Sequence, residues 1–135
     1  MALLITLTTS RFDPSQEPEN DINPIAGHSL LVWLREEILG DGCETTEPAT
    51  EDWGWYIDAL TDFDQYMIGS ICYWEKGDSI DGPLEWMLQI HKNRTLKDKL
   101  LGRNKLDPDD PFFGRILAAL NAEGSFLDVQ WQSNT

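Results

Sequence analysis

The sequence has few basic residues and no long apolar run. Its 135 residues include 10 Lys and Arg against 24 Asp and Glu, which gives a formal net charge of −14. A field of that sign repels nucleic acid and anionic membrane surfaces and favours basic partners. No stretch approaches the roughly 20 apolar residues that span a bilayer. We therefore expect neither direct nucleic-acid binding nor membrane association.

Cysteine is also scarce. Cys43 and Cys72 are the only two cysteines, so a disulfide-rich framework is excluded. Met1–Thr9 is apolar, but it lacks the basic start, the long apolar core and the small-residue cleavage site of a signal peptide. We expect a cytoplasmic protein with reduced thiols.

Motifs of common catalytic and cofactor sites are missing. No CxxC, HxxxH or HExxH spacing offers a zinc site, and the acids at 107–110 lack the glycine turn and terminal Glu of a calcium loop. Neither a GxSxG elbow nor a glycine-rich phosphate loop occurs. A reactive thiol at Cys43, which follows a Gly-Asp-Gly turn, stays open as an alternative. The sequence favours a protein that is not an enzyme, with no catalytic residue, metal or cofactor.

Alternation of apolar and polar residues predicts an antiparallel sheet within one globular domain, residues 1–135. Because the connections between consecutive strands are short, we expect a meander. Pro48–Asp52 is predicted to be a turn. The expected strands are Ala2–Thr8, a short edge strand at Cys43–Thr46, Trp53–Leu60, Tyr66–Glu75, Pro83–His91 and Phe126–Trp131.

Helical spacing predicts three helices. The first begins at Asn23-Pro24, or later near His28-Ser29, and ends at Gly40. The second is capped by Thr95, and its apolar face is made by Leu96, Leu100 and Leu101. The third begins at Asp107-Pro108 or at Asp110-Pro111 and ends at Gly124.

These elements predict an α+β fold in the order β-α-β-β-β-(β)-α-α-β. It has an antiparallel sheet of about five strands with two to three helices packed on one face. We expect residues 10–23 to form an exposed acidic loop and residues 132–135 a flexible tail.

Charge is distributed unevenly along the chain. Residues 1–90 carry 18 acids and 3 bases, whereas residues 92–105 carry six bases and one acid, a net charge of +5. This basic island predicts binding of a phosphate, a carboxylate or an acidic protein surface. The alternative is that it pairs with the acidic surface of the protein itself. The candidate anion-binding residues are Lys92, Arg94, Lys97, Arg103 and Lys105.

The acidic part of the chain predicts docking on a basic partner. Carboxylates can occupy a basic groove, and Trp and Tyr anchor interfaces. Two Trp of the segment Asp52-Trp-Gly-Trp-Tyr are expected on one face of a strand, where they line an interface or, alternatively, belong to the core. Further acids lie in the 10–23 loop, at Asp13, Glu17, Glu19 and Asp21. The candidate partner-binding residues are Glu44, Glu47, Glu51, Asp52, Trp53 and Trp55.

The same Trp segment, Asn23-Pro24-Ile25 and the stretch Leu100–Lys105 resemble a family of small uncharacterised bacterial proteins. That resemblance implies no activity and no functional residue. By analogy, small acidic bacterial proteins of this build are often immunity proteins or inhibitors.

We therefore expect a non-enzymatic acidic binding protein of the inhibitor or immunity type, a monomer or a homodimer, docking on a basic protein. One alternative is a small-anion-binding domain or minor enzyme that uses residues 92–105. Another is a structural subunit of a bacterial assembly.

Overall fold

A seven-stranded antiparallel sheet forms the body of the protein in the computed structural model, which describes residues 2–40 and 42–134. The strands lie side by side in the order β2-β4-β5-β6-β1-β7, and β3 also pairs with β4. Their bounds are Ala2–Thr9 (β1), Glu44–Thr45 (β2), Ala49–Glu51 (β3), Gly54–Leu60 (β4), Gln65–Cys72 (β5), Leu84–Lys92 (β6) and Leu127–Asn134 (β7).

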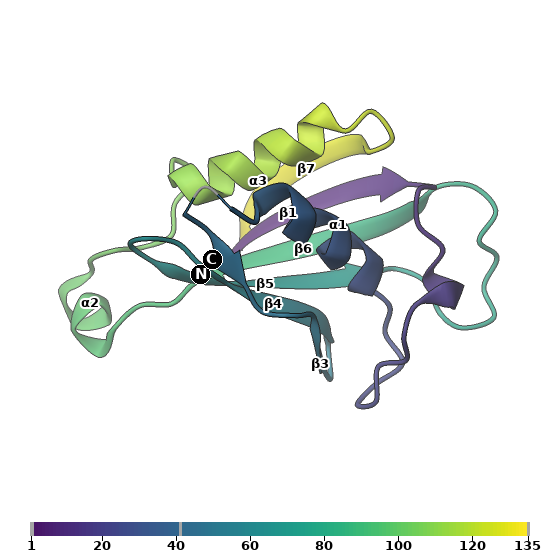
Figure 1. Ribbon diagram of the computed structural model, residues 1–135, viewed down its shortest axis with the longest axis horizontal. Coiled ribbons are helices and arrows are strands. Elements are labelled where there is room, and N and C mark those ends of the chain that lie inside the picture. The colour runs from purple at the N-terminus through teal and green to yellow at the C-terminus, as the bar shows by residue number, and fades with distance from the viewer. Residues whose placement is uncertain (1, 41, 135) are drawn as a thin grey trace.

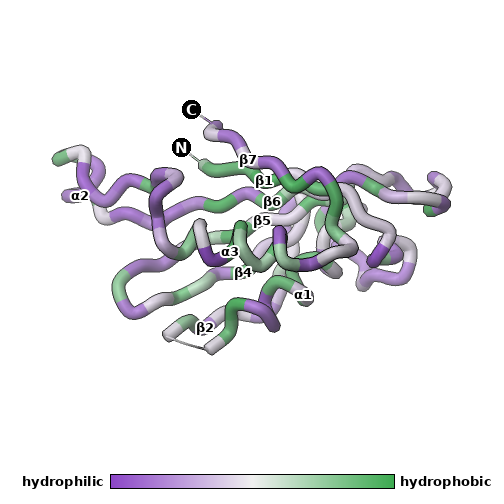
Figure 2. Tube along the Cα trace, turned by 90° about the horizontal axis from the view of Figure 1, so that it is seen from above, coloured by the Kyte–Doolittle hydropathy of each residue, from purple (hydrophilic) through white to green (hydrophobic). Residues whose placement is uncertain are grey.

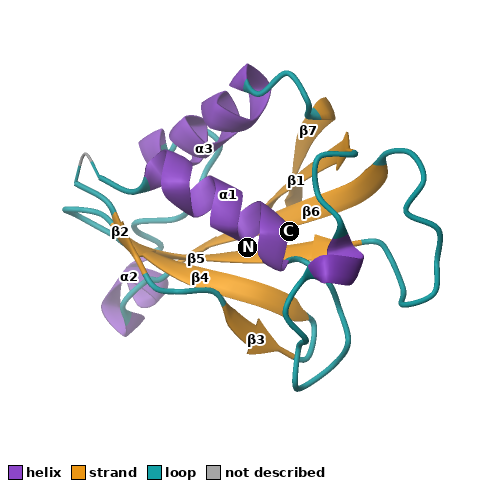
Figure 3. Cartoon of the chain, turned by 45° about the vertical axis from the view of Figure 1, so that its right-hand side comes forward, coloured by secondary structure: helices purple, strands orange, loops and turns teal. Residues whose placement is uncertain are grey.

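Two of the three α-helices cover one face of this sheet. α1 (His28–Ile38) and α3 (Pro111–Ala122) lie side by side on it, whereas α2 (Leu96–Leu101) stands apart beyond the end of the strands (Figures 1 and 3). A short 3-10 helix, Pro14–Gln16, follows β1. The opposite face of the sheet carries no helix among the described residues.

The core lies between the sheet and the two helices. Alternate residues of each long strand point into it, and those of β1 are almost fully buried. From the helices, Leu30, Leu34 and Ile116 fill the same layer. The inward residues of the sheet that are at most 1% exposed are Leu3, Ile5, Leu7, Thr9, Ile57, Ala59, Ile68, Ser70, Trp86, Leu88 and Ile90.

The predicted α+β class is confirmed, but the details differ. The sheet has seven strands instead of about five, because the short edge strand predicted at Cys43–Thr46 forms as β2 and the expected turn at Pro48–Asp52 contains β3; both pair with β4. Two helices pack on the sheet, within the predicted two to three, but the second of the three predicted helices, α2, is not one of them. α1 begins at His28, the later of the two predicted starts. The predicted tail at 132–135 is wrong as far as Asn134, because β7 continues to that residue; Thr135 lies outside the described residues.

The predicted loop at 10–23 is anchored. The Glu17 carboxylate accepts hydrogen bonds from the backbone N–H groups of Gly27, His28 and Ser29, at 2.9, 3.0 and 2.8 Å. It therefore caps the N-terminus of α1 from a distant segment, where a negative charge is stabilising. Pro14 of this loop is buried as well.

Candidate functional site

The basic island forms an arm, residues 93–105, that leaves the sheet after β6 and carries α2. Thr95 accepts a hydrogen bond from the Asp98 N–H at 3.0 Å and caps the helix, as expected from the sequence. Gly102 ends it in the left-handed conformation, with φ of 63°. The Arg94 guanidinium closes the base of the arm, donating to the carbonyls of Arg103 at 3.0 Å and Asp98 at 3.2 Å.

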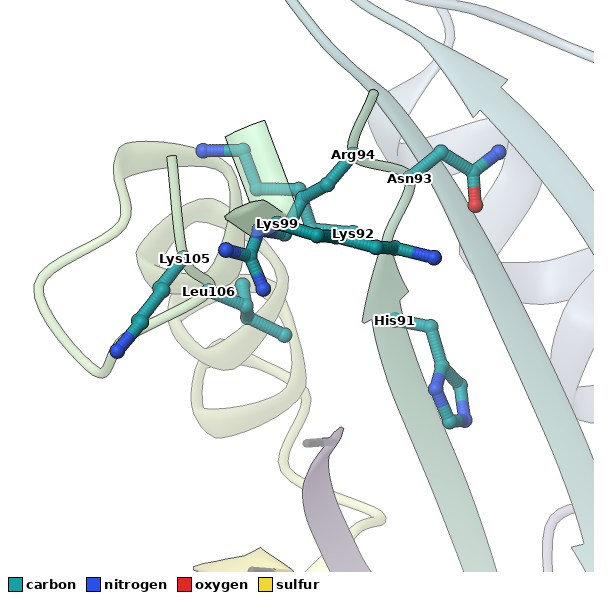
Figure 4. A pocket seen from close by; sticks show the side chains of 7 residues that line it. All are labelled: His91, Lys92, Asn93, Arg94, Lys99, Lys105 and Leu106. Carbon is teal, nitrogen blue, oxygen red and sulfur yellow. The ribbon is translucent and has the colours of Figure 1, made fainter. Parts of the chain in front are cut away.

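A hollow of about 530 Å³ lies between the arm and the end of β6 (Figure 4). Burial lowers the pKa of His91, so this imidazole is neutral at neutral pH and adds no charge to the hollow. Lys99 and Lys105 make no ion pair with any described residue. The lining residues are His91, Lys92, Asn93, Arg94, Lys99, Lys105 and Leu106.

Lys92 belongs to a buried ionic network of the protein itself. Its Nζ lies 3.3 Å from Asp110 and 3.6 Å from Asp64, and its side chain is only 8% exposed. Asp110 also accepts from the Tyr66 hydroxyl at 2.9 Å and from the first N–H groups of α3. Burial, together with Asp110, raises the pKa of Tyr66. The network ties β5, β6 and α3 together, so Lys92 is not available to a ligand.

The five predicted anion-binding residues therefore do not form one site. Lys92 and Arg94 are engaged inside the protein, and Arg103 pairs with Asp98 at 3.6 Å. Lys97 is exposed but does not line the hollow. Of the predicted set, Arg94 and Lys105 line the hollow without an ion pair among the described residues, but the Arg94 guanidinium already donates to two backbone carbonyls. Lys99 joins Lys105 there and was missing from that set.

α2 exposes its apolar residues instead of burying them. Leu96, Leu100 and Leu101 are 74%, 77% and 57% exposed, and α2 has no buried residue. The predicted apolar face exists, but it does not pack on the sheet. Asn104 bonds to Asp64 at 3.1 Å, so the arm lies against the β4–β5 turn, where Phe63 is 92% exposed.

Carboxylates gather at the opposite end of the sheet, which we call the acidic end. Three connections lie there: loop 10–27, the β3–β4 turn and loop 73–83. This follows from the strand pairing, in which Trp55 lies opposite Ser70, Cys72 opposite Trp86 and Thr9 opposite Leu84. Figure 1 shows these loops on the right, far from α2. Seven carboxylate residues of these connections and the adjoining start of β6 are exposed: Glu19, Asp21, Asp52, Glu75, Asp78, Asp81 and Glu85.

Asn20 fixes the loop and the turn of the acidic end to each other. This side chain is 9% exposed, and its amide donates to the carbonyls of Glu51 at 3.0 Å and Gly54 at 2.9 Å. Its oxygen accepts from the N–H groups of Ile22 and Asn23. The neighbouring acids are thus presented on an ordered backbone. The sequence did not single out Asn20, because its role depends on a partner strand 31 or more residues away.

The predicted partner-binding residues lie in different parts of the structure. Glu51 and Asp52 lie at the acidic end, whereas Glu44 lies on β2, opposite Leu60 at the other end of β4. Glu47 pairs with Arg35 at 3.1 Å. These four carboxylates therefore do not form one surface.

The two Trp of that prediction do not share a face. Trp55 is 5% exposed, and its indole N–H donates to the Ile25 carbonyl at 3.1 Å, so it belongs to the core. Trp53 lies in the β3–β4 turn, and its ring covers Gly69, where a Cβ would be 2.5 Å from it. Gly54 serves packing, since a Cβ there would lie 2.7 Å from the Ser70 carbonyl. Trp53 alone is half-exposed beside the acidic end.

The thiols are buried. Cys43 and Cys72 are both free, and burial raises the pKa of each, for Cys72 to about 12. A thiol that stays protonated is a poor nucleophile, which argues against the reactive Cys43 left open above. Within residues 2–40 and 42–134, no three His, Cys, Asp or Glu side chains are grouped so as to hold a metal ion. In the same ranges no helix has the length and apolar character needed to cross a bilayer.

No family model, curated protein or solved structure matches the chain. The resemblance to small bacterial proteins stays a prediction, and function has to be argued from the surfaces described above.

Proposed function

We propose that the protein is a non-enzymatic binding protein, of the inhibitor or immunity type, whose acidic end docks on a basic surface of a partner protein. The observation that carries the proposal is the group of seven exposed carboxylates at one end of the sheet. None of the seven forms an ion pair with another described residue. Unpaired charges of one sign steer a partner of the opposite sign and fix its orientation.

The same end also offers apolar contacts. Ile22 is 59% exposed, Tyr73 54% and Ile80 43%, and all three lie in the connections that carry the acids. Interfaces commonly combine such apolar or aromatic anchors with a polar rim. Because Asn20 and Glu17 hold the loop by hydrogen bonds, little order has to be gained on binding, which favours affinity.

A lysine-rich peptide with a fluorescent label is a suitable probe of this surface. We expect saturable binding by fluorescence anisotropy that weakens as salt rises, because the charges are exposed. Replacing Glu19, Asp21 and Asp52 by Gln, Asn and Asn should weaken binding about tenfold, or roughly 0.5 kcal/mol for each charge.

The matched control removes three charges elsewhere. Glu36, Glu37 and Glu44 are exposed on α1 and β2, away from the acidic end. Their replacement by Gln changes net charge equally, and we expect less than about a twofold effect. Equal losses in both variants would show that only net charge matters and would refute a site at the acidic end.

A second candidate function is binding of a small anion in the hollow beside the arm. It is favoured by Lys99 and Lys105, which line the hollow without an acidic partner among the described residues. Inorganic phosphate or pyrophosphate at 100 times its Kd should stabilise the protein by about 2.7 kcal/mol in a thermal melt. Lys99→Gln with Lys105→Gln should abolish the shift and Lys76→Gln should keep it. A melt unchanged by either anion would exclude this function.

A further inference from the structure

The two edges of the sheet differ in how they are protected. One edge of β4 is covered by β2 and β3, strands of two and three residues. Pro48 and the charged Glu47 lie between them. Short strands, proline and charge are the features by which proteins block pairing with a foreign strand. This edge is therefore closed to another chain.

The other edge is β7, and it lacks these features over most of its length. β7 has eight residues and pairs with β1 on one side only, so its outer backbone groups face no other described strand (Figure 2). The register shifts at its start, where Asp128 has φ of 52°. From Gln130 to Asn134 the pairing is regular, opposite Thr6 to Ala2. Residues 129–134 contain no charge and no proline.

The surface beside β7 is uncharged too. Phe113 of α3 contacts Trp131, with ring centroids 5.8 Å apart, so this flank of α3 borders β7. Gly114, Leu117 and Asn121 follow on the same flank by helical spacing. Arg115, the only charged residue of α3, donates to the carbonyl of Ile38 at the C-terminal end of α1, so its side chain points away from β7. A quarter of all residues of the chain are charged, yet residues 129–134 and this flank of α3 carry no charge.

We propose that β7 pairs with β7 of a second copy of this chain, in antiparallel register about a two-fold axis, and joins two sheets into one. A second copy fits better than another partner because both bordering surfaces are then neutral. The net charge of −14 opposes contact between two copies elsewhere, whereas residues 129–134, which meet here, carry no charged side chain. An isologous contact of this kind closes on itself and leaves no further edge free.

The regular segment sets the centre of this contact. A two-fold axis at Gln132, the middle of Gln130–Asn134, places Trp131 opposite Ser133 of the partner subunit. Trp131 is 45% exposed in the single chain, and a small residue opposite leaves room for its ring. Each copy keeps its acidic end and its arm accessible, because these lie at the ends of the strands and not along the edge.

Sedimentation equilibrium of the purified protein tests the proposal. The mass should rise from 15.4 kDa toward twice that value across the micromolar range. Added salt should strengthen association, because it screens the −14 charge while the interface itself is neutral. This salt dependence is opposite to that expected for peptide binding at the acidic end. Failure of dimerisation can therefore be distinguished from failure of the proposed binding function. A single-chain mass at high micromolar concentration and high salt would overturn dimerisation.

Variants decide whether β7 is the interface. Gln130→Glu with Gln132→Glu puts like charges across the two-fold axis and should keep the protein monomeric, with an unchanged far-ultraviolet spectrum. Gln89→Glu on β6, on the helix-free face, is the control and should still dimerise. A doubly substituted variant that dimerises like the parent would overturn the β7 assignment.

A cysteine cross-link provides a second measurement should the charged variant fail to fold. Directly opposed residues of antiparallel strands have Cα atoms 4.5–5.5 Å apart, within the reach of a disulfide. Gln132→Cys should therefore give a disulfide-linked dimer under mild oxidation, and Gln89→Cys should not. The native thiols are buried and do not compete. Absence of the Gln132 cross-link would contradict the proposed axis.

Discussion

Removal of the Glu17 carboxylate should destabilise the whole domain, although Glu17 lies in a loop. Three backbone N–H groups at the start of α1 donate to it, and α1 supplies a large part of the core. Loss of a helix cap costs about 1 kcal/mol, and loss of a negative charge at a partly buried helix N-terminus costs up to about 2 kcal/mol. We expect Glu17→Ala to lower the free energy of unfolding by about 3 kcal/mol.

Urea unfolding followed by tryptophan fluorescence measures this loss. In a domain of this size it corresponds to a fall in Tm of about 10 °C. Glu17→Gln keeps an acceptor but loses the charge, so its cost should be about half as large. Glu19→Ala is the control, because Glu19 is exposed and makes no hydrogen bond or ion pair with described residues. A cost below about 1 kcal/mol for Glu17→Ala, or an equal cost for Glu19→Ala, would refute the capping role.

The remaining predictions concern packing, buried charge and pH. Lys92→Met and Asp110→Asn should each cost about 2–3 kcal/mol, because each single change removes the nearer partner of a buried charge. The double variant should cost less than the sum of the two, and additive costs in urea unfolding would contradict the network. Gly54→Ala should cost about 2 kcal/mol, because its Cβ would lie 2.7 Å from a β5 carbonyl, whereas Gly124→Ala, with open space, should be neutral in the same assay. Burial raises the pKa of Cys72 from 9.0 to about 12. The stabilisation that the buried, protonated thiol gives the folded state is therefore complete below pH 9 and is lost as the pH rises from 9 through about 12, which lowers the Tm. Cys72→Ala should remove part of this fall in Tm, and an identical dependence of Tm on pH in the variant would disprove the prediction.

Much of the fold follows from periodicity. The alternation in Pro83–His91 predicted β6, and the Asp110-Pro111 pair marks the start of α3. β3 was missed because a strand of three residues is too short to show a recognisable alternation of apolar and polar residues. The end of β7 was predicted to be a flexible tail because Gln132, Ser133 and Asn134 are polar; at an exposed edge, however, a strand needs no apolar face.

The candidate surfaces were less predictable than the fold. Composition located the acidic segments and the basic island, but it did not show which of these charges are already engaged in hydrogen bonds or ion pairs within the protein. Lys92 is paired with a residue 18 positions later in the chain, and Glu17 with one ten positions later. A further signal was available: in an antiparallel meander alternate connections share an end, so loop 73–83 and the β3–β4 turn could have been grouped. The position of β1 next to β6, which adds loop 10–27, depends on packing across the whole chain.

The exposed leucines of α2 have an evolutionary consequence. Because Leu96, Leu100 and Leu101 contribute nothing to the core, core packing places no constraint on them. Random substitution would replace such residues with polar ones over time unless something other than stability retains them. A library of variants sorted first for folding and then for growth of the host would separate the two pressures. Tolerance in the first sort with depletion in the second would identify the arm as a surface under selection for contact with another molecule.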